Sequence, residues 1–311
     1  MRNMAKPPIR EINQINDLII NEPSKIIIEA EDRYSKQIKN TAKIISENPN
    51  EHVIVMLAGP SGSGKTTTAH KLVDALAENG IKAHTVSLDD FYYGIGIAPV
   101  LPDGSLDYES LAALDIPAMK KCLWELAQTG ETILPIFDFI TGAPSQEKRH
   151  LITEPNDVVI FEGIHALNPE ITGELGTDKL MKIYVSVKQD YHNGDEILLY
   201  GRDVRLIRRI VRDFYFRSSN VENTMDMWTQ VIRGEEKYIK PFKHSADIIL
   251  DSYHCFEPCL MRTMALPLLD KVKMDSEFFN KACFLTKQLQ RFQPMELSQL
   301  PMDSLLREFT G

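Results

Sequence analysis

The chain has 311 residues, of which 43% are hydrophobic and 25% charged, and its formal net charge is −9. This length and apolar content suit one large α/β domain with appendages, whereas the acidic balance argues against a nucleic-acid coat or an anionic-membrane binder, both of which need a basic face. Because no apolar run approaches the roughly 18 residues that span a bilayer, and residues 1–8 lack the apolar core of a signal peptide, we expect a cytosolic protein with neither a nucleic-acid nor a membrane partner.

Strands and helices are predicted to alternate along most of the chain. A helical pattern at 29–46 belongs to an N-terminal extension over 1–50, and helices are also predicted at 65–79 and 116–129. Strands are predicted at 53–58, 82–88, 132–137, 157–161, 180–187 and 246–250. This alternation indicates a mainly parallel sheet with helices on both faces, within a core over 51–252. Residues 253–311 are predicted to be helical and to pack on the core or on a partner such as a second copy of the chain.

The segment from Gly59 to Thr66 reads GPSGSGKT and matches the pattern GxxxxGK[ST] at every fixed position. It follows an apolar strand and opens a helix, which is the context that such a phosphate-binding loop requires. Its backbone N–H groups can turn toward one point, Lys65 brings a cation to the terminal phosphates, and Thr66 offers a hydroxyl to Mg²⁺. We therefore predict that this phosphate loop binds ATP with Mg²⁺, through Gly59, Ser61, Gly62, Ser63, Gly64, Lys65, Thr66 and Thr67.

Carboxylates follow two of the predicted strands. Asp89 and Asp90 come directly after strand 82–88, and Glu162 closes strand 157–161. Because the carboxyl ends of parallel strands meet at one edge of a sheet, these acids are expected beside the phosphate loop. One carboxylate there can hold Mg²⁺, and another can accept the proton of an attacking hydroxyl. The alternative for each acid is a helix cap or a turn residue, and it is stronger for Asp90 and Asp138 than for Asp89 and Glu162.

Arginines recur in the segment 201–213. On a helix, Arg205, Arg209 and Arg212 share one face, opposite an apolar stripe. We interpret this face as part of a mobile lid, over about 196–240, whose cations close on the transferring phosphoryl group and exclude water. The alternative is a solvated face paired with neighbouring acids.

The cysteines do not indicate a disulfide framework or a metal site. Cys122, Cys255, Cys259 and Cys283 are few and scattered for a chain of this size. His254 directly precedes Cys255, and Cys259 follows shortly after, but no second ligand pair stands at a suitable spacing. We expect ordinary packed thiols.

Taken together, these motifs resemble the uridine kinase and phosphoribulokinase family of P-loop kinases. Residues 89–92 are similar to the family's Asp-x-Phe-Tyr element, 137–139 to its Tyr-Asp-Phe element, and 161–164 to its Phe-Glu-Gly-Ile element. Residues 205–213 look like its lid. The likeness covers about 50–252 and is nearest to a bacterial branch of nucleoside or uridine kinases.

The resemblance implies a P-loop NTPase fold and an ATP-dependent kinase that phosphorylates a hydroxyl of a small metabolite. It makes Asp89 the general base, which acts with Lys65, Arg209 and Arg212 in catalysis. It implies that Mg²⁺ is held by Thr66, Glu162 and Asp89. It further implies that the acceptor contacts Tyr92, Phe137, Asp138 and Arg217.

The chain departs from the uridine kinase pattern where the pyrimidine and its ribose would bind. Phe137 replaces a tyrosine, 141–143 lacks a usual histidine, and Ser218 follows Arg217 where a second arginine is usual. We predict a nucleoside acceptor, most favourably the 5′-hydroxyl of uridine or cytidine, with weakened discrimination between bases. The alternatives are a kinase for pantothenate, glycerate or a sugar phosphate, and a non-catalytic nucleotide-binding regulator. A GTP-driven switch is disfavoured because its Asp-x-x-Gly and Asn-Lys-x-Asp motifs are absent.

Overall fold

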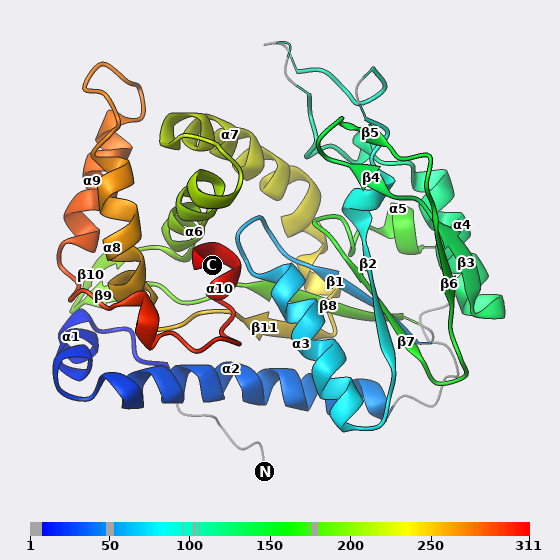
Figure 1. The fold of residues 1–311 in the computed structure, drawn as a ribbon, viewed down its shortest axis with the longest axis horizontal. Coiled ribbons are helices and arrows are strands. Elements are labelled where there is room, and N and C mark those ends of the chain that lie inside the picture. The colour runs from blue at the N-terminus through cyan, green and yellow to red at the C-terminus, as the bar shows by residue number, and fades with distance from the viewer. Residues whose placement is uncertain are drawn as a thin grey trace.

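A five-stranded parallel sheet lies at the centre of the computed structural model, which describes residues 8–47, 53–94, 96–101, 104, 106–173, 175 and 180–311 (Figure 1). The strand order is β11-β8-β1-β7-β2, and every neighbouring pair is parallel. The strands are β1 (Val53–Ala58), β2 (Ala83–Ser87), β7 (Val158–Glu162), β8 (Leu180–Ser186) and β11 (Ile248–Asp251). Residues 48–50, which follow the helical pattern at 29–46, lie outside the described residues.

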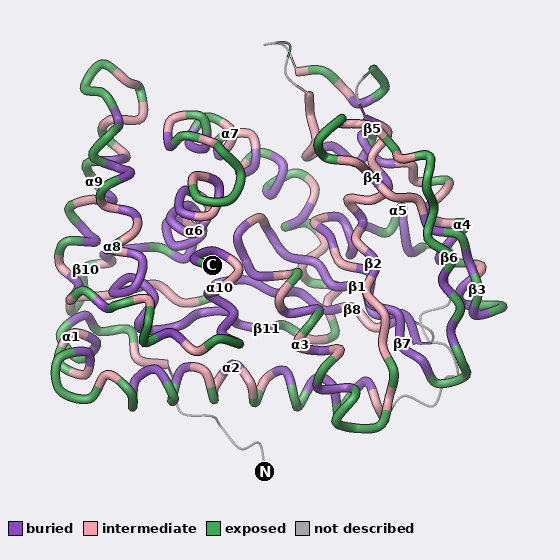
Figure 2. Tube along the Cα trace, viewed as in Figure 1, coloured by how far each residue is buried: buried purple, intermediate pink, exposed green. Residues whose placement is uncertain are grey.

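The two faces of this sheet are covered by different helices. Alternate residues of β1 point to opposite faces, so that Val53, Val55 and Leu57 join one buried cluster and Ile54 and Met56 join another. The first cluster includes side chains from α2 (Pro23–Ser46), α3 (Lys65–Glu78), α6 (Gly201–Phe216) and α8 (Glu257–Leu269). The second includes side chains from α4 (Ile116–Thr129) and α5 (Pro169–Thr172). Burial on both faces explains why the central strands are almost continuously apolar (Figure 2).

The predicted strand 132–137 does not join the central sheet. It divides into β3 (Glu131–Leu134), which pairs antiparallel with β6 (Arg149–Ile152), and β4 (Phe137–Asp138), which pairs antiparallel with β5 (Ala143–Pro144). Exposed and buried residues alternate along β3. Because only one side of β3 is covered, it suits a surface ribbon against α4 and not the doubly covered centre of a parallel sheet.

The remaining elements extend the fold at both ends of the core. Helix α1 (Ile12–Asn21) precedes α2, and a ribbon of β9 (Tyr191–Asn193) and β10 (Glu196–Leu199) leads into α6. Helix α7 (Val221–Gly234) follows α6 and continues into a π turn at Glu235–Ile239. The last helices are α9 (Phe279–Leu289) and α10 (Arg307–Thr310). Both α8 and α10 contact α6, so residues 253–311 pack on the core of their own chain.

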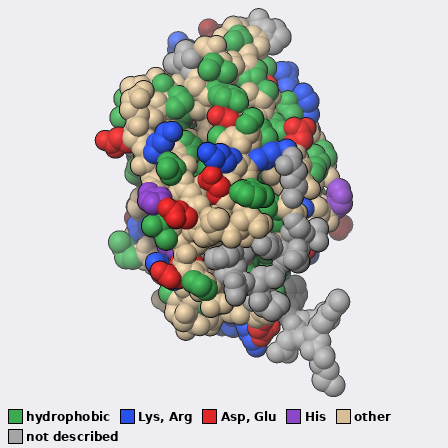
Figure 3. Space-filling model, turned by 90° about the vertical axis from the view of Figure 1, so that its right-hand side faces the viewer, with side chains coloured by type: hydrophobic (Ala, Val, Ile, Leu, Met, Phe, Trp, Pro, Cys, Tyr) green, Lys and Arg blue, Asp and Glu red, His purple; other side chains and the backbone are tan. Residues whose placement is uncertain are grey.

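One face of the molecule carries side chains of mixed character (Figure 3). Acidic, basic and hydrophobic side chains are interspersed over the face shown in Figure 3. Within the described part of the chain, no helix is long and apolar enough to cross a membrane. The cysteines are free thiols, and three of the four are buried.

Candidate active site

The phosphate loop leaves the end of β1 and enters α3 at Lys65. Gly62 and Gly64 have φ angles of 75° and 87°, in the left-handed region that favours glycine. A Cβ at Gly59 would lie 2.3 Å from the carbonyl oxygen of Val185, so the end of β8 also requires glycine there. The glycines of the motif therefore let the chain turn tightly while neighbouring backbone passes close by. Ser63 is fully buried within this turn.

Two arginines of α6 hold the loop from behind. Arg205 donates from Nη1 to the carbonyl oxygen of Ser61 at 3.1 Å, and Arg208 donates from Nη1 to that of Gly62 at 3.1 Å. Both guanidinium groups are buried and form ion pairs, Arg205 with Glu235 at 2.6 Å and Arg208 with Glu257 at 2.5 Å. Arg205 was expected beside Arg209 and Arg212 on one phosphate-facing lid surface. That expectation is wrong for Arg205, because its charge is already neutralised inside the protein.

Arg209 and Arg212 lie at the surface of the site, with 12% of each side chain exposed. Arg209 donates from Nη1 to the hydroxyl oxygen of Ser61 at 3.0 Å, so it reaches the phosphate loop directly. The two guanidinium groups share the buried carboxylate of Asp213, at 3.0 and 3.3 Å. Asp213 thereby fixes both cations in place.

The sheet order brings three predicted residues together. Strand β7 lies between β1 and β2, so Glu162 at its end stands between the phosphate loop and Asp89. Thr66, one of the two residues predicted to hold Mg²⁺ with Asp89, donates to Oε1 of the other, Glu162, at 3.3 Å. Burial raises the pKa of Glu162 to about 7, and although Lys65 opposes this shift, Asp89 adds to it. This edge of the sheet therefore concentrates negative charge around one lysine.

This arrangement suits a bound Mg²⁺. The hydroxyl of Thr66 and a carboxylate oxygen of Glu162 are hard oxygen donors at one point, and Ser87 adds a hydroxyl at 3.4 Å from the same Glu162 oxygen. A divalent cation would also compensate the carboxylate whose pKa burial raises. No cluster of three or more His, Cys, Asp or Glu arranged around a metal occurs among the described residues. Mg²⁺ needs no such cluster, because it commonly takes one or two side chains together with phosphate and water oxygens.

Asp89 and Asp90 have different surroundings. Burial raises the pKa of Asp89, and the negative charge of Asp90 adds to this shift. The positive charges of Lys65 and Arg217 oppose it. Asp89 therefore lies within electrostatic reach of both Lys65 and Arg217. Asp90 instead accepts the backbone N–H of Phe137 at 3.3 Å and so anchors β4. Of the two acids, Asp89 is the one that faces the phosphate loop.

An aromatic cluster stands next to Asp89. Tyr92 meets Phe137 and Tyr108 edge to face, with ring centroids 5.7 and 5.2 Å apart, and Phe137 meets Phe139 at 5.1 Å. The hydroxyl of Tyr92 donates to the backbone of Tyr108 at 3.0 Å. Phe137 is 6% exposed, whereas Phe139 is 67% exposed. The predicted residues Tyr92 and Phe137 therefore form part of one apolar wall.

Asp138 and Arg217, the other two residues predicted to contact the acceptor, differ in their position relative to Asp89 and the aromatic cluster. The carboxylate of Asp138 accepts hydrogen bonds from the backbone N–H of Ile140 at 2.8 Å and the hydroxyl of Thr141 at 2.8 Å. These bonds lower its pKa and turn it toward its own loop. Arg217 is 57% exposed and lies 3.7 Å from Asp213, beyond the end of α6. Its charge also interacts with that of Asp89.

Sequence reasoning missed Glu109 and His165. Glu109 has a buried Oε2 that finds no hydrogen-bond partner in the described structure, and burial raises its pKa to about 7 in spite of nearby Arg209 and Lys65. His165 is 1% exposed, and burial lowers its pKa to about 4, although a contact with the backbone of Glu109 opposes this shift. The only sequence feature that could have pointed to His165 as a site residue is the neighbouring motif at Glu162. No periodic pattern in the sequence distinguishes Glu109.

Comparisons with known proteins agree with this geometry. A family model described as "Phosphoribulokinase / Uridine kinase family" matches residues 54–257. A uridine kinase of Lactobacillus johnsonii is 31% identical over 199 residues, which is 64% of this chain and 85% of the relative. A uridine kinase of Halobacterium salinarum is 29% identical over 203 residues, 62% of this chain and 77% of the relative. A solved structure from Silicibacter sp. TM1040, provisionally assigned as a fructose transport system kinase, superposes with a TM-score of 0.50 at 18% identity. The superposition covers 68% of this chain and 98% of that one, so the two proteins share the fold.

Proposed function

Because the chain belongs to the phosphoribulokinase/uridine kinase family and is thus a P-loop phosphotransferase acting on a hydroxyl of a small metabolite, we propose that it transfers the γ-phosphoryl group of ATP to the 5′-hydroxyl of a nucleoside, most favourably uridine or cytidine. The observation that carries this proposal is that three adjacent strands lead into the phosphate loop with Lys65, into Asp89 and into Glu162, at one edge of the sheet. A cytosolic location remains a prediction from the sequence.

The chemistry follows from the charges at this edge. Asp89 accepts the proton of the attacking hydroxyl, and its raised pKa strengthens it as a base relative to an exposed aspartate. Lys65 neutralises charge on the terminal phosphates, while Arg209, fixed by Ser61 and Asp213, supplies a second cation at the mouth of the loop. Preorganised cations of this kind stabilise the transferring group without reorganising during the reaction.

Thr66 and Glu162 would hold Mg²⁺, for which their oxygens fit. When bound, the ion would neutralise negative charge on the phosphates. Asp89, whose charge raises the pKa of Glu162, would be a further partner of the same ion.

The aromatic cluster favours a nucleoside over other small alcohols. An apolar wall beside Asp89, the proposed general base, consists of Tyr92, Tyr108 and Phe137. Phe139 next to it exposes most of its ring. A planar base can pack on such rings, whereas glycerate or a sugar phosphate has no flat apolar face to bury. Glu109, whose carboxyl interacts electrostatically with Asp89, Lys65 and Arg209, offers a further polar group to the acceptor.

The test is an ADP-release assay with ATP and Mg²⁺ against a panel of nucleosides, pantothenate, glycerate and sugar phosphates. We expect a nucleoside to give the highest kcat/KM, with less discrimination between bases than a dedicated uridine kinase shows, because Phe137 has no hydroxyl to penalise a mismatched base. Phe137→Tyr should then sharpen the pyrimidine preference.

A variant of the phosphate loop tests the kinase assignment separately from the nucleoside assignment. Lys65→Ala should lower kcat by on the order of 100-fold or more, because a cation directed at the phosphates is lost. If another alcohol gives a kcat/KM well above every nucleoside, the nucleoside assignment fails while the kinase assignment stands. If the Lys65 variant turns over at the parent rate, the phosphate loop is not the reaction site.

A further inference from the structure

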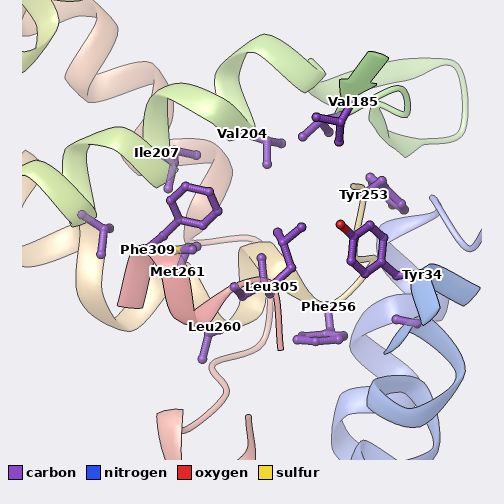
Figure 4. Close-up of a cluster of buried hydrophobic side chains, with 14 of the residues drawn as sticks. Tyr34, Val185, Val204, Ile207, Tyr253, Phe256, Leu260, Met261, Leu305 and Phe309 are labelled. Atoms are coloured by element: carbon purple, nitrogen blue, oxygen red, sulfur yellow. The ribbon is translucent and has the colours of Figure 1, made fainter. Parts of the chain in front are cut away.

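The segment 304–311 returns to the phosphate loop after a long excursion through α8 and α9. Leu305 and Phe309 are both fully buried and lie in one apolar cluster with side chains of α6 (Figure 4). Leu305 packs so closely on the loop that a Cβ at Gly64 would lie 2.7 Å from its Cδ1. The ring of Phe309 lies 5.0 Å from the guanidinium carbon of Arg208. Apolar packing therefore anchors this segment against the loop.

Glu308 lies between these two anchors and points its carboxylate at the start of α3. Its Oε2 accepts the hydroxyl of Thr67 at 2.7 Å and the backbone N–H of Thr67 at 3.3 Å. Its Oε1 lies 3.8 Å from Nη1 of Arg212. Only 18% of the Glu308 side chain is exposed. A single carboxylate thus accepts the hydrogen-bond donors of Thr67 and also lies close to Arg212, one of the two surface arginines of the site.

Thr67 is the third residue of a helix of 14 residues, so its N–H has no partner within the helix. Free N–H groups at such a helix start are the donors that cradle nucleotide phosphates. A phosphate oxygen and the Glu308 carboxylate are both anions, and they need the same hydrogens of Thr67. They cannot share these hydrogens at contact distance without strong repulsion.

We propose that Glu308 competes with a nucleotide phosphate for Thr67 and thereby sets the affinity of the site for ATP. This inference rests on the proposed function only in taking the phosphate loop as the nucleotide site. When the phosphate binds, Glu308 gives up Thr67 and turns to Arg212, which is already within 3.8 Å. Because Leu305 and Phe309 stay packed, only the side chain of Glu308 has to move. The carboxylate therefore raises the threshold for nucleotide binding without opening the fold.

The electrostatics of the neighbouring carboxylate agree with this geometry. Glu308 is one of the acids that raise the pKa of Glu162, after burial and Asp89. An incoming phosphate would meet the same negative charge. Moving the Glu308 carboxylate away from Thr67 therefore ends the competition for the Thr67 donors. It also weakens the repulsion between Glu308 and the phosphate.

The test is calorimetric titration of the full chain with ADP, which binds without turnover. Glu308→Gln keeps the size of the side chain and an oxygen acceptor but removes the charge that competes with phosphate. We expect it to lower the Kd for ADP about tenfold, since hydrogen bonds to charged groups are roughly twice as strong as neutral ones. The control is Asp303→Asn, which removes an acid of the same segment that is 87% exposed and lies 3.5 Å from Lys71. Its Kd should match the parent.

Glu308→Asp provides a second variant should the first fail to fold. It keeps the charge but withdraws it from Thr67 by one methylene, so it should also tighten ADP binding. Unchanged or weaker ADP binding in a folded Glu308 variant would overturn the proposal and make Glu308 a support of the loop. If Lys65→Ala abolishes ADP binding while the Glu308 variants match the parent, only this inference fails. If the parent binds no nucleotide at all, the proposed function fails with it.

Discussion

Arg208 and Glu257 form a fully buried ion pair directly behind the phosphate loop. Nε and Nη2 of Arg208 donate to the two carboxylate oxygens of Glu257 at 2.5 and 2.7 Å. The same guanidinium donates to the carbonyl oxygens of Gly62 at 3.1 Å and Ser252 at 2.8 Å. One arginine therefore joins α6, the phosphate loop, the segment after β11 and the start of α8. The position of the loop depends on a buried network that touches no phosphate.

Arg208→Met should lower the free energy of unfolding by about 3–5 kcal/mol, because it leaves the Glu257 carboxylate buried without a countercharge. Urea unfolding measures this loss. The matched control is Arg202→Met, whose partner Glu236 is half exposed, and we expect a loss below about 1 kcal/mol there. Replacing Glu257 by Leu in the Arg208→Met background should restore much of the stability but not nucleotide binding, since Gly62 still lacks its donor. Similar small losses for both single variants would contradict this account.

Asp89→Asn should reduce kcat by roughly 10²–10⁴-fold, because the amide keeps the shape but cannot accept a proton. Nucleotide affinity should change little. Steady-state kinetics of Asp90→Ala provides the contrast: this variant lacks the oxygen that accepts the backbone N–H of Phe137, so it should act mainly on the KM for the acceptor. A normal kcat in Asp89→Asn would remove Asp89 from the role of base.

Glu162→Gln should stabilise the nucleotide-free protein at alkaline pH while it impairs catalysis. Folding raises the pKa of this carboxyl from 4.5 to about 7, so the ionised carboxylate destabilises the folded state increasingly as pH rises through this interval. We expect the variant to be more stable than the parent by about 2 kcal/mol at pH 8, and by much less at pH 4.5. Urea unfolding at both pH values measures the difference. The exposed Glu78→Gln is the control, and an equal gain at both pH values would contradict the assignment.

Arg209→Ala and Arg212→Ala should lower kcat more than they weaken nucleotide binding, if these surface cations act on the transferring group. Arg205→Ala should instead lower stability, because it leaves Glu235 buried without its partner. Arg233→Ala, on the exposed surface of α7, serves as the control for a general loss of positive charge. Kinetics at two salt concentrations, together with urea unfolding, separate these effects. A modest KM change that salt screens would instead favour a solvated, non-catalytic face for Arg209 and Arg212.

Much of the site could be predicted because its signals are local in the chain. The phosphate loop is one continuous turn, and its glycines are required by the backbone angles of that turn itself. Asp89 and Glu162 directly follow strands, and parallel pairing brings strand ends to one edge whatever the order of the strands. The strand 132–137 was assigned wrongly to the sheet, because an apolar strand on a surface ribbon and one inside a sheet differ only in which neighbours cover them.

The amino-acid sequence by itself therefore determined the chemistry of this edge: a phosphate loop, a lysine and carboxylates at strand ends. The tertiary structure alone decided which charges are free to act. Arg205 and Arg208 look like Arg209 and Arg212 in the sequence, but their partners Glu235 and Glu257 stand 30 and 49 residues away. Glu308 meets Thr67 across 241 residues. Periodicity along one helix identifies a shared face, whereas the neutralisation of a charge depends on which distant segment packs against it.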